Sequence, residues 1–330
     1  MTLDRVRGSL LAESRAWTSL HDDELRRRAV QAAAEKDIAT LVSLTTAYLA
    51  AQGASGVLSS PRTAEAYALG TRQFLEYARE QAVNLLRPGR HDAQGYVGAL
   101  LAAGRKPAGV GLKVAAASCL YRALRWAGAT EADPFRDVRV PRDPTPGLVK
   151  RPPYSEEEIA DVLEQADVQA KLLVFLTAHA GLRISEALAL QWDDLDEARK
   201  RLHVRSGKGR RGRVVAMSTS LARALRHYRG LYGPGGPHHA DGKRTTPPSA
   251  LFRYASPMTA KYHLEKAFKA ADVPFRGFHA GRKYAGTRLI QQIRDFGRVA
   301  AHLGHASVDT TRRGYAQLAD DDLKEDLAGW

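Results

Sequence analysis

A tyrosine close to the end of the chain, Tyr315, stands among groups that could turn it into a nucleophile. Arg312 and Arg313 precede it, and His305 lies ten residues before it, in a segment of small and hydroxyl residues. A phenol with a pKa of about 10 is a poor nucleophile at neutral pH. It needs cations nearby and a target that is already electrophilic. The chemistry to look for is therefore attack on a group held by positive charge.

A second arginine site follows a run of nearly all apolar residues, 168–180, which predicts a buried helix ended by Gly181. Arg183 opens the next helix, and Glu186 lies three residues on, on the same face. A surface ion pair is the alternative interpretation of these two residues. The position of Arg183, directly after a buried helix, is what makes it a candidate.

A lysine between two glycines, Lys208, lies in the turn between two predicted strands, 202–205 and 213–217. The glycines permit a tight hairpin, from which the ammonium group can reach a groove. Arg210 and Arg211 share the turn as candidate contacts for a polyanion. A phosphate-binding P-loop is excluded, because Gly-Lys-Ser/Thr is absent and no helix follows.

Two pairs of histidines raise the question of a metal. His238 and His239 are adjacent in a loop rich in Gly, Pro and His, and His302 and His305 are three residues apart. Neither pair is accompanied by the cysteines, spaced carboxylates or glutamate pattern of a zinc site. We therefore expect no metal and no other cofactor.

The charge of the chain points to a polyanionic partner. The 330 residues carry a formal net charge of +14, with a pI near 9.9, which favours nucleic acid. The segment after Tyr315 carries −4, which leaves +18 on the rest of the chain. The hydrophobic share of 44% is typical of a globular protein, and the length allows two domains.

The chain shows no feature of an exported or membrane protein. Its one cysteine, Cys119, cannot form an intrachain disulfide and lies in an apolar helical pattern. There is no apolar run long enough to span a bilayer and no signal-peptide core at the N-terminus. We expect a cytoplasmic protein with no membrane partner.

Helical periodicity dominates the N-terminal half. Residues 22–51 are helical in pattern, Ser60-Pro61 marks a helix start, and further helices are predicted near 92–103 and 108–127. Five bases are expected on outward faces as candidate DNA contacts: Arg62, Arg72, Lys113, Arg122 and Arg125. Residues 139–153 contain five prolines and predict a basic, semi-rigid linker.

Taken together, these segments resemble the tyrosine recombinases, the family of phage integrases and Xer-like proteins. The likeness rests on Gly-Leu-Arg-Ile-Ser-Glu-Ala-Leu (181–188), the Gly-Lys-Gly hairpin, His-Ala-Gly-Arg (279–282) and Leu-Gly-His (303–305) before Tyr315. It spans roughly residues 55 to 318. In the N-terminal half it includes Thr-Ala-Glu-Ala-Tyr (63–67), Leu-Tyr-Arg-Ala-Leu (120–124) and Asp-Pro-Phe (133–135).

The resemblance implies metal-free cleavage of DNA. Arg183 and Arg282 would hold the non-bridging phosphate oxygens, and His305 would add a third donor. Lys208 would protonate the leaving 5′ oxygen, and His279 would accept the proton of Tyr315. Glu186 would be a supporting residue. Tyr315 would form a 3′-phosphotyrosyl adduct, which the 5′-hydroxyl of another strand reverses.

The fold that the resemblance implies is mainly α with a small β-sheet. A helical core-binding (SAM-like) domain and a mixed α/β catalytic domain would clamp the DNA. The ranges expected are an N-terminal helical extension (1–54), the core-binding domain (55–138), the linker (139–153), the catalytic domain (154–318) and an acidic tail (319–330). The tail, with apolar residues among its acids, would dock on a neighbouring subunit of a tetramer formed on a double-stranded target site.

Two departures from the family pattern bear on the site. Gly281 stands where the family usually has leucine, which puts local packing in question. His305 and Tyr315 are separated by one residue more than usual, and in a continuous helix this would rotate the tyrosine by about 100°. A break or bulge at Arg313-Gly314 is expected to absorb it. A type IB topoisomerase and a non-catalytic DNA-binding protein remain as alternative functions.

Overall fold

The computed structural model describes residues 12–53, 61–141, 145, 147–150, 152–205, 212–233, 249–254, 256–312 and 314–315. The chain divides into two compact units, Met1–Pro144 (unit 1) and Thr145–Trp330 (unit 2). Each unit is described by itself. Among the helices of the described residues, none has both the length and the apolar character needed to cross a membrane.

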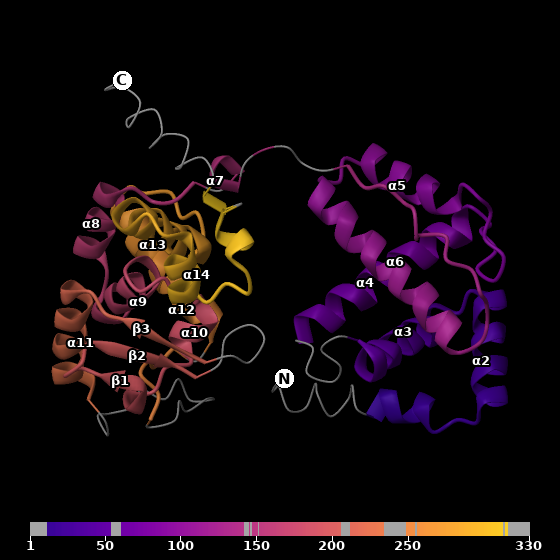
Figure 1. Ribbon diagram of the computed structural model, residues 1–330, viewed down its shortest axis with the longest axis horizontal. Helices are drawn as coiled ribbons and strands as arrows, with labels where there is room; N and C mark the ends of the chain where they lie inside the picture. The colour runs from indigo at the N-terminus through magenta and orange to yellow at the C-terminus, as the bar shows by residue number, and fades with distance from the viewer. Residues whose placement is uncertain are drawn as a thin grey trace. The chain divides into compact units, whose positions relative to one another are not determined.

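Unit 1 is built from helices in its described part (Figure 1). Besides the helical residues 12–18, it contains α2 (Asp22–Glu35), α3 (Ile38–Gln52), α4 (Pro61–Glu80), α5 (Asp92–Ala102) and α6 (Pro107–Trp126). The predicted helices near 92–103 and 108–127 are thus confirmed. The helical stretch 22–51 is two helices, because Lys36 takes a left-handed conformation (φ 53°) and the Asp37 carboxylate caps the second helix.

The core of unit 1 combines the first helices with the later ones. Leu41 and Leu44 of α3 lie in the same apolar cluster as Phe74 of α4 and Tyr121 of α6. Phe74 packs edge-on against Phe135, with 5.3 Å between ring centroids. Helices α2 and α3, which precede position 55, are therefore part of the same hydrophobic core as the predicted core-binding helices.

Unit 2 places a small sheet among helices (Figure 1). Its elements are α7 (Gly147–Lys150), α8 (Glu156–Gln165), α9 (Val168–Ala178), α10 (Ile184–Leu188), the 3-10 helix η2 (Trp192–Asp194), β1 (Leu195–Asp196), β2 (Arg201–Val204), β3 (Arg213–Ala216), α11 (Thr219–Tyr232), α12 (Pro257–Ala270), α13 (Phe278–Ile293) and α14 (Phe296–Leu303). The fold is mainly α with one small sheet, as predicted.

The three strands form an antiparallel sheet in the order β1-β2-β3. Leu202 pairs with Val215, and both side chains are buried in the core of unit 2. The hairpin predicted from the Gly-Lys-Gly turn is thus confirmed in its two strands, while the turn itself, with Lys208, Arg210 and Arg211, lies outside the described residues.

Local sequence signals explain how α8 and α9 begin. Ser155 and Glu158 form the capping box that the sequence predicts, with the Ser155 hydroxyl accepting from the Glu158 backbone and the Glu158 carboxylate accepting from Ser155. Asp167 caps α9, which is buried along most of its length. Gly181, with φ at 66°, then turns the chain toward Arg183.

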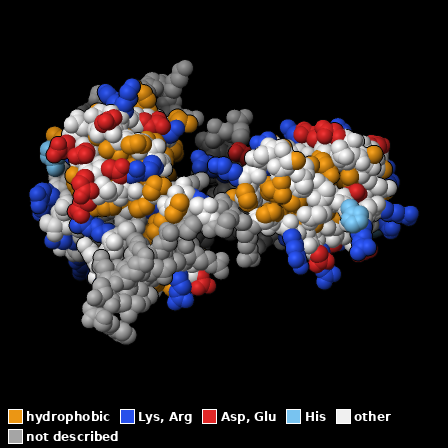
Figure 2. Space-filling view, turned by 90° about the horizontal axis from the view of Figure 1, so that it is seen from above, with side chains coloured by type: hydrophobic (Ala, Val, Ile, Leu, Met, Phe, Trp, Pro, Cys, Tyr) orange, Lys and Arg blue, Asp and Glu red, His pale blue; other side chains and the backbone are white. Residues whose placement is uncertain are grey.

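Figure 2 shows acidic as well as basic side chains on the surface of both units. The excess of lysine and arginine is therefore mixed with acids on the face in view.

Candidate active site

The first arginine of the site is held by a carboxylate from its own helix. Arg183 is the N-cap of α10, and its backbone N–H donates to Glu186 Oε2 at 2.9 Å. Its Nη1 donates to Glu186 Oε1 at 2.7 Å and its Nη2 to the carbonyl oxygen of Gly304 at 3.1 Å. The Glu186 side chain is 2% exposed. The pair is therefore a buried part of the site and not a surface ion pair.

The second arginine, Arg282, lies in the second turn of α13 and is 5% exposed. Its Nη1 donates to the carbonyl oxygen of Gly181 at 2.6 Å and its Nη2 to that of Leu303 at 2.7 Å. Burial and then the charge of Arg183 lower the pKa of Arg282 to about 10, so it stays cationic at neutral pH. Two carbonyl groups thus fix a guanidinium that burial alone would disfavour.

The glycine that replaces the family's leucine has a packing reason. A Cβ at Gly281 would lie 3.1 Å from Thr177 Oγ1 and 3.5 Å from Thr177 Cβ, on α9. Helix α13 continues unbroken through this position. The missing side chain therefore lets α13 lie close to α9, and the departure leaves the helix of Arg282 intact.

His305 follows the end of α14, where Gly304 takes a left-handed conformation (φ 68°). Its Nδ1 lies 2.6 Å from the hydroxyl of Thr311, which is fully buried. Burial and then the charges of Arg282, Arg183 and nearby Arg213 lower the pKa of His305 to about 4. At neutral pH it is a neutral imidazole, which can still donate one hydrogen bond.

Tyr315 lies inside the unit and is 4% exposed. It packs with Ile290, Val299 and Leu303. Its hydroxyl lies against Gly286, so close that a Cβ on this glycine would be only 2.0 Å from Tyr315 Oη. Burial raises the pKa of Tyr315 to about 12, against the opposing effect of Arg282. The Tyr315 phenol is therefore desolvated and protonated, and its hydroxyl lies beside Gly286, one helical turn along α13 from Arg282.

The helix around Tyr315 is described in part. Residues 308–312 and then Gly314 and Tyr315 are helical, and Arg313 between them lies outside the described residues. The break expected at Arg313-Gly314 stays a prediction.

The structure thus brings together Arg183, Glu186, Arg282, His305 and Tyr315. His279 lies in the first turn of α13, three residues before Arg282, and is exposed. Among the bases predicted to contact DNA in unit 1, Arg62, Arg72 and Arg122 are exposed. Lys113 contacts Gln73, and Arg125 pairs with Asp133 at 3.2 Å and donates to the carbonyl oxygen of Ala132.

One residue of the site, Arg213, was missed by sequence reasoning. It begins β3, and its guanidinium donates to both carboxylate oxygens of Glu186, at 3.1 and 2.9 Å. Burial works against the charge of Glu186, but the bonds from Arg213 and Arg183 outweigh it and lower the pKa of Glu186 to about 2. The signal in the sequence was a further basic residue at the start of the strand that follows the lysine turn.

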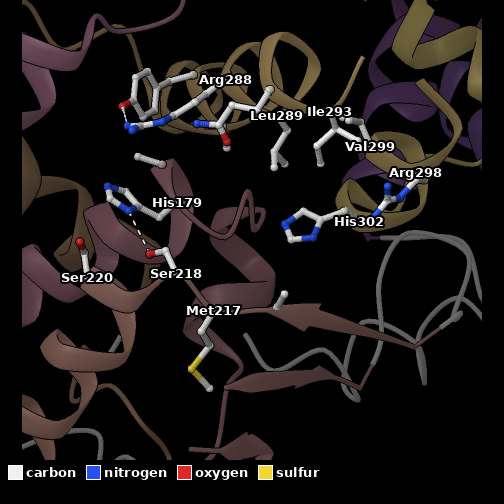
Figure 3. A pocket seen from close by; sticks show the side chains of 15 residues that line it. His179, Met217, Ser218, Ser220, Arg288, Leu289, Ile293, Arg298, Val299 and His302 are labelled. Carbon is white, nitrogen blue, oxygen red and sulfur yellow. Dashed lines mark hydrogen bonds between the residues drawn. The ribbon is translucent and has the colours of Figure 1, made fainter. Parts of the chain in front are cut away.

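A cavity of about 540 Å³ lies beside α14, on the side that His302 faces. Figure 3 shows His179, Met217, Leu289, Ile293 and Val299 around it, with the Nδ1 of His179 3.1 Å from the hydroxyl of Ser218. Arg288 and Arg298 are the cations of its lining. In the part of the chain that the structure describes, no cluster of three His, Cys, Asp or Glu side chains could hold a metal ion.

Comparison with known proteins gives a consistent family. Residues 154–322 match the phage integrase family. The tyrosine recombinase XerC of Mesorhizobium japonicum is 31% identical over 274 residues, which cover 77% of this chain and 84% of the relative. The XerC of Myxococcus xanthus is 29% identical over 280 residues, covering 81% and 90%.

Solved structures show the same fold. The integrase of the Tn1549 transposon, in complex with a circular intermediate DNA, matches with a TM-score of 0.61 at 16% identity, over 86% of this chain and 98% of that one. A lambda integrase dimer bound to a COC' core site matches with a TM-score of 0.58 at 16% identity, over 77% and 89%.

Proposed function

This chain belongs to the phage integrase family of tyrosine recombinases, and we propose that it cuts and rejoins DNA at specific sites through a 3′-phosphotyrosyl intermediate on Tyr315. The observation that carries the assignment is the arrangement of Arg183 and Arg282, whose guanidinium groups are fixed by backbone carbonyls next to the tyrosine. Fixed cations in a water-poor site stabilise a pentacovalent phosphate without a metal ion. The family and its DNA-acting relatives favour this activity over relaxation of supercoils.

Each remaining residue has a role in this scheme. His305, neutral and oriented by Thr311, donates one hydrogen bond to a phosphate oxygen. His279 accepts the proton of Tyr315, and Lys208 protonates the departing 5′ oxygen. The scissile bond breaks as the bond from Tyr315 to phosphorus forms, so the adduct keeps the energy needed for a 5′-hydroxyl to restore the strand.

The proposed partner is a double-stranded target site, contacted by the bases on unit 1 and by Arg210 and Arg211 of unit 2. The compartment we propose is the cytoplasm, where a recombinase of this family meets its DNA. We also propose that a tetramer forms on the DNA, because exchange joins strands from two sites, each cut on both strands.

We propose that the tail, residues 319–330, contacts a neighbouring subunit at the cavity beside α14. The cavity combines apolar side chains, among them Leu289 and Ile293, with the cations Arg288 and Arg298. The tail combines leucines and a tryptophan with five acids in its sequence. Apolar and charge complementarity both favour this pairing.

The activity can be tested with duplexes of random sequence. A library of nicked duplexes with a random central segment is incubated with the protein, and denaturation-resistant adducts are isolated and sequenced to give a selected duplex. We expect an adduct with the wild type and none with Tyr315→Phe, which should bind the selected duplex nearly as well. An adduct on the Phe variant would remove Tyr315 from this role.

The test of the tail uses two independent changes. Deletion of 318–330 and Ile293→Glu, which places an acid where the acidic tail would lie, should both reduce multi-subunit complexes on the selected duplex in native gels. Met258→Glu, at an exposed position on α12, is the matched control. Normal complexes from both altered proteins would refute the docking.

A further inference from the structure

Arg213 lies at the centre of the charged site, although it belongs to β3, the strand that follows the lysine turn in the sequence. Its Nε donates to the carbonyl oxygen of His302 at 2.9 Å, in addition to the two bonds from its Nη groups to Glu186. The side chain is 10% exposed. A bidentate pair with a third bond to a helix end fixes the guanidinium in one orientation.

The C-terminal end of α14 packs closely against the guanidinium group of Arg213. A Cβ at Gly304 would lie 2.9 Å from Arg213 Nη1 and 3.0 Å from its Cζ. The carbonyl groups of His302, Leu303 and Gly304 accept bonds from Arg213, Arg282 and Arg183 respectively. Three consecutive carbonyls therefore orient three arginines, and only two of these are assigned to the phosphate.

The charges of the cluster explain what the third arginine does. Among the described residues, Glu186 is the carboxylate that bonds to Arg183, and its side chain is 2% exposed. If Glu186 paired with Arg183 alone, the two charges would cancel in a region where water screens them poorly. Because Arg213 takes both oxygens of the same carboxylate, two cations share one anion, and Arg282 adds a third positive charge nearby.

We propose that Arg213 is a positioning residue whose positive charge offsets that of Glu186, so that Arg183 is oriented by the carboxylate and still presents its charge to the scissile phosphate. This inference rests on the proposed function. It assigns Arg213 no contact with the DNA. A purely structural tie between β3 and α14 would use the same three bonds, and only the charge separates the two roles.

A charge-balanced pair of substitutions tests this. Arg213→Gln leaves Glu186 paired with Arg183 alone, and we expect single-turnover adduct formation on the selected duplex to fall by about 100-fold. Glu186→Gln added to it restores the balance, and we expect the double variant to recover at least about tenfold over Arg213→Gln. Arg213→Lys keeps the charge without the bidentate geometry of the guanidinium group, and its rate of adduct formation should lie between those of Arg213→Gln and the wild type.

The control is Arg199→Gln, which removes an exposed arginine that pairs with Asp196 at the surface, and should cleave like the wild type. A double variant no faster than Arg213→Gln overturns the charge role. If adduct formation by Arg213→Lys is also as slow as that by Arg213→Gln, the role of Arg213 is structural alone. Absence of an adduct with the wild type would instead reject the proposed function, so the two failures are distinguishable.

Discussion

The interior of unit 1 holds a cluster of aromatic rings, whereas unit 2 holds, beside an apolar core that also contains aromatic rings, a cluster of three guanidinium groups and one carboxylate. In unit 1, Phe74 contacts the rings of Tyr96, Tyr121 and Phe135 at centroid distances of 5.1 to 6.1 Å. In unit 2, Glu186 bonds to two arginines. Ring contacts stabilise a fold directly. Buried charges cost desolvation and are neutralised only by their neighbours.

This difference indicates which substitutions affect stability and which affect chemistry. Burial of the rings of unit 1 stabilises the folded state, so their truncation should lower the free energy of unfolding. In the proposed function the charges of unit 2 bind the scissile phosphate, so their loss should lower cleavage more than stability. Each of the following variants breaks or sharpens this contrast.

Lys208→Ala should have the largest effect, and this effect should be confined to the rate of cleavage. A general acid contributes on the order of 10² to 10⁴ in rate, so cleavage of the selected duplex should slow by about that factor while binding changes little. A duplex with sulfur in place of the 5′ bridging oxygen needs almost no acid, because a thiolate leaves easily. Cleavage of this duplex by the variant should approach the wild-type rate; continued slow cleavage would assign the acid role elsewhere.

Phe74→Ala should act on stability alone. Phe74 is 1% exposed, and truncation of a buried phenylalanine costs about 3–5 kcal/mol. Leu69→Ala, on the same helix at a position that is 56% exposed, should change stability by less than about 0.5 kcal/mol. Urea unfolding followed by circular dichroism measures both. Equal stability of the two variants would contradict the assignment of Phe74 to the core.

The charged site should make stability depend on pH through His305. Its pKa is lowered to about 4 in the fold, against about 6.5 in an unfolded chain. Between these values the unfolded chain binds a proton that the folded chain does not, so stability falls as pH is lowered from about 6.5 to about 4. His305→Gln should therefore lose less thermal stability than the wild type between about pH 7 and about pH 5. An unchanged loss would mean that His305 does not contribute.

Much of the fold follows from rules that act within a few residues. The capping box at Ser155, the buried helix that ends before Gly181 and the two strands around the lysine turn were all predicted, because caps, glycine and periodicity act locally. The split at Lys36 was missed although Asp37, a residue suited to an N-cap, marks it in the sequence.

The centre of the site could not be predicted in the same way. Arg213 meets Glu186 across 27 residues and His302 across 89. Local pattern carries no information about such contacts, and the carbonyl oxygens that orient the arginines belong to residues whose side chains give no hint of it. The family resemblance supplied Arg183, Glu186 and Arg282 because it carries tertiary information that periodicity lacks.

The smallest effect concerns the place where Tyr315 rests. A methyl group at Gly286 would overlap the Tyr315 hydroxyl, whereas one at Gly314 meets no atom within 4 Å. We expect Gly286→Ala to displace the ring from a resting position and raise the population of the attacking state, so that cleavage becomes faster by up to about tenfold. Overpacking should lower stability by about 1–3 kcal/mol.

Gly314→Ala adds the same methyl group without the overlap, so it isolates the role of backbone freedom before the tyrosine. If the chain must bend at Arg313-Gly314 to absorb the extra residue, this variant should slow single-turnover cleavage of the selected duplex and leave stability nearly unchanged. Opposite signs for the two alanines are therefore the expected result, because one substitution destabilises the resting state and the other hinders departure from it. Slower cleavage by Gly286→Ala would mean that the buried position of Tyr315 is the reactive one. Equal rates for Gly314→Ala and the wild type would show that the extra residue is absorbed at another point of the chain between His305 and Tyr315.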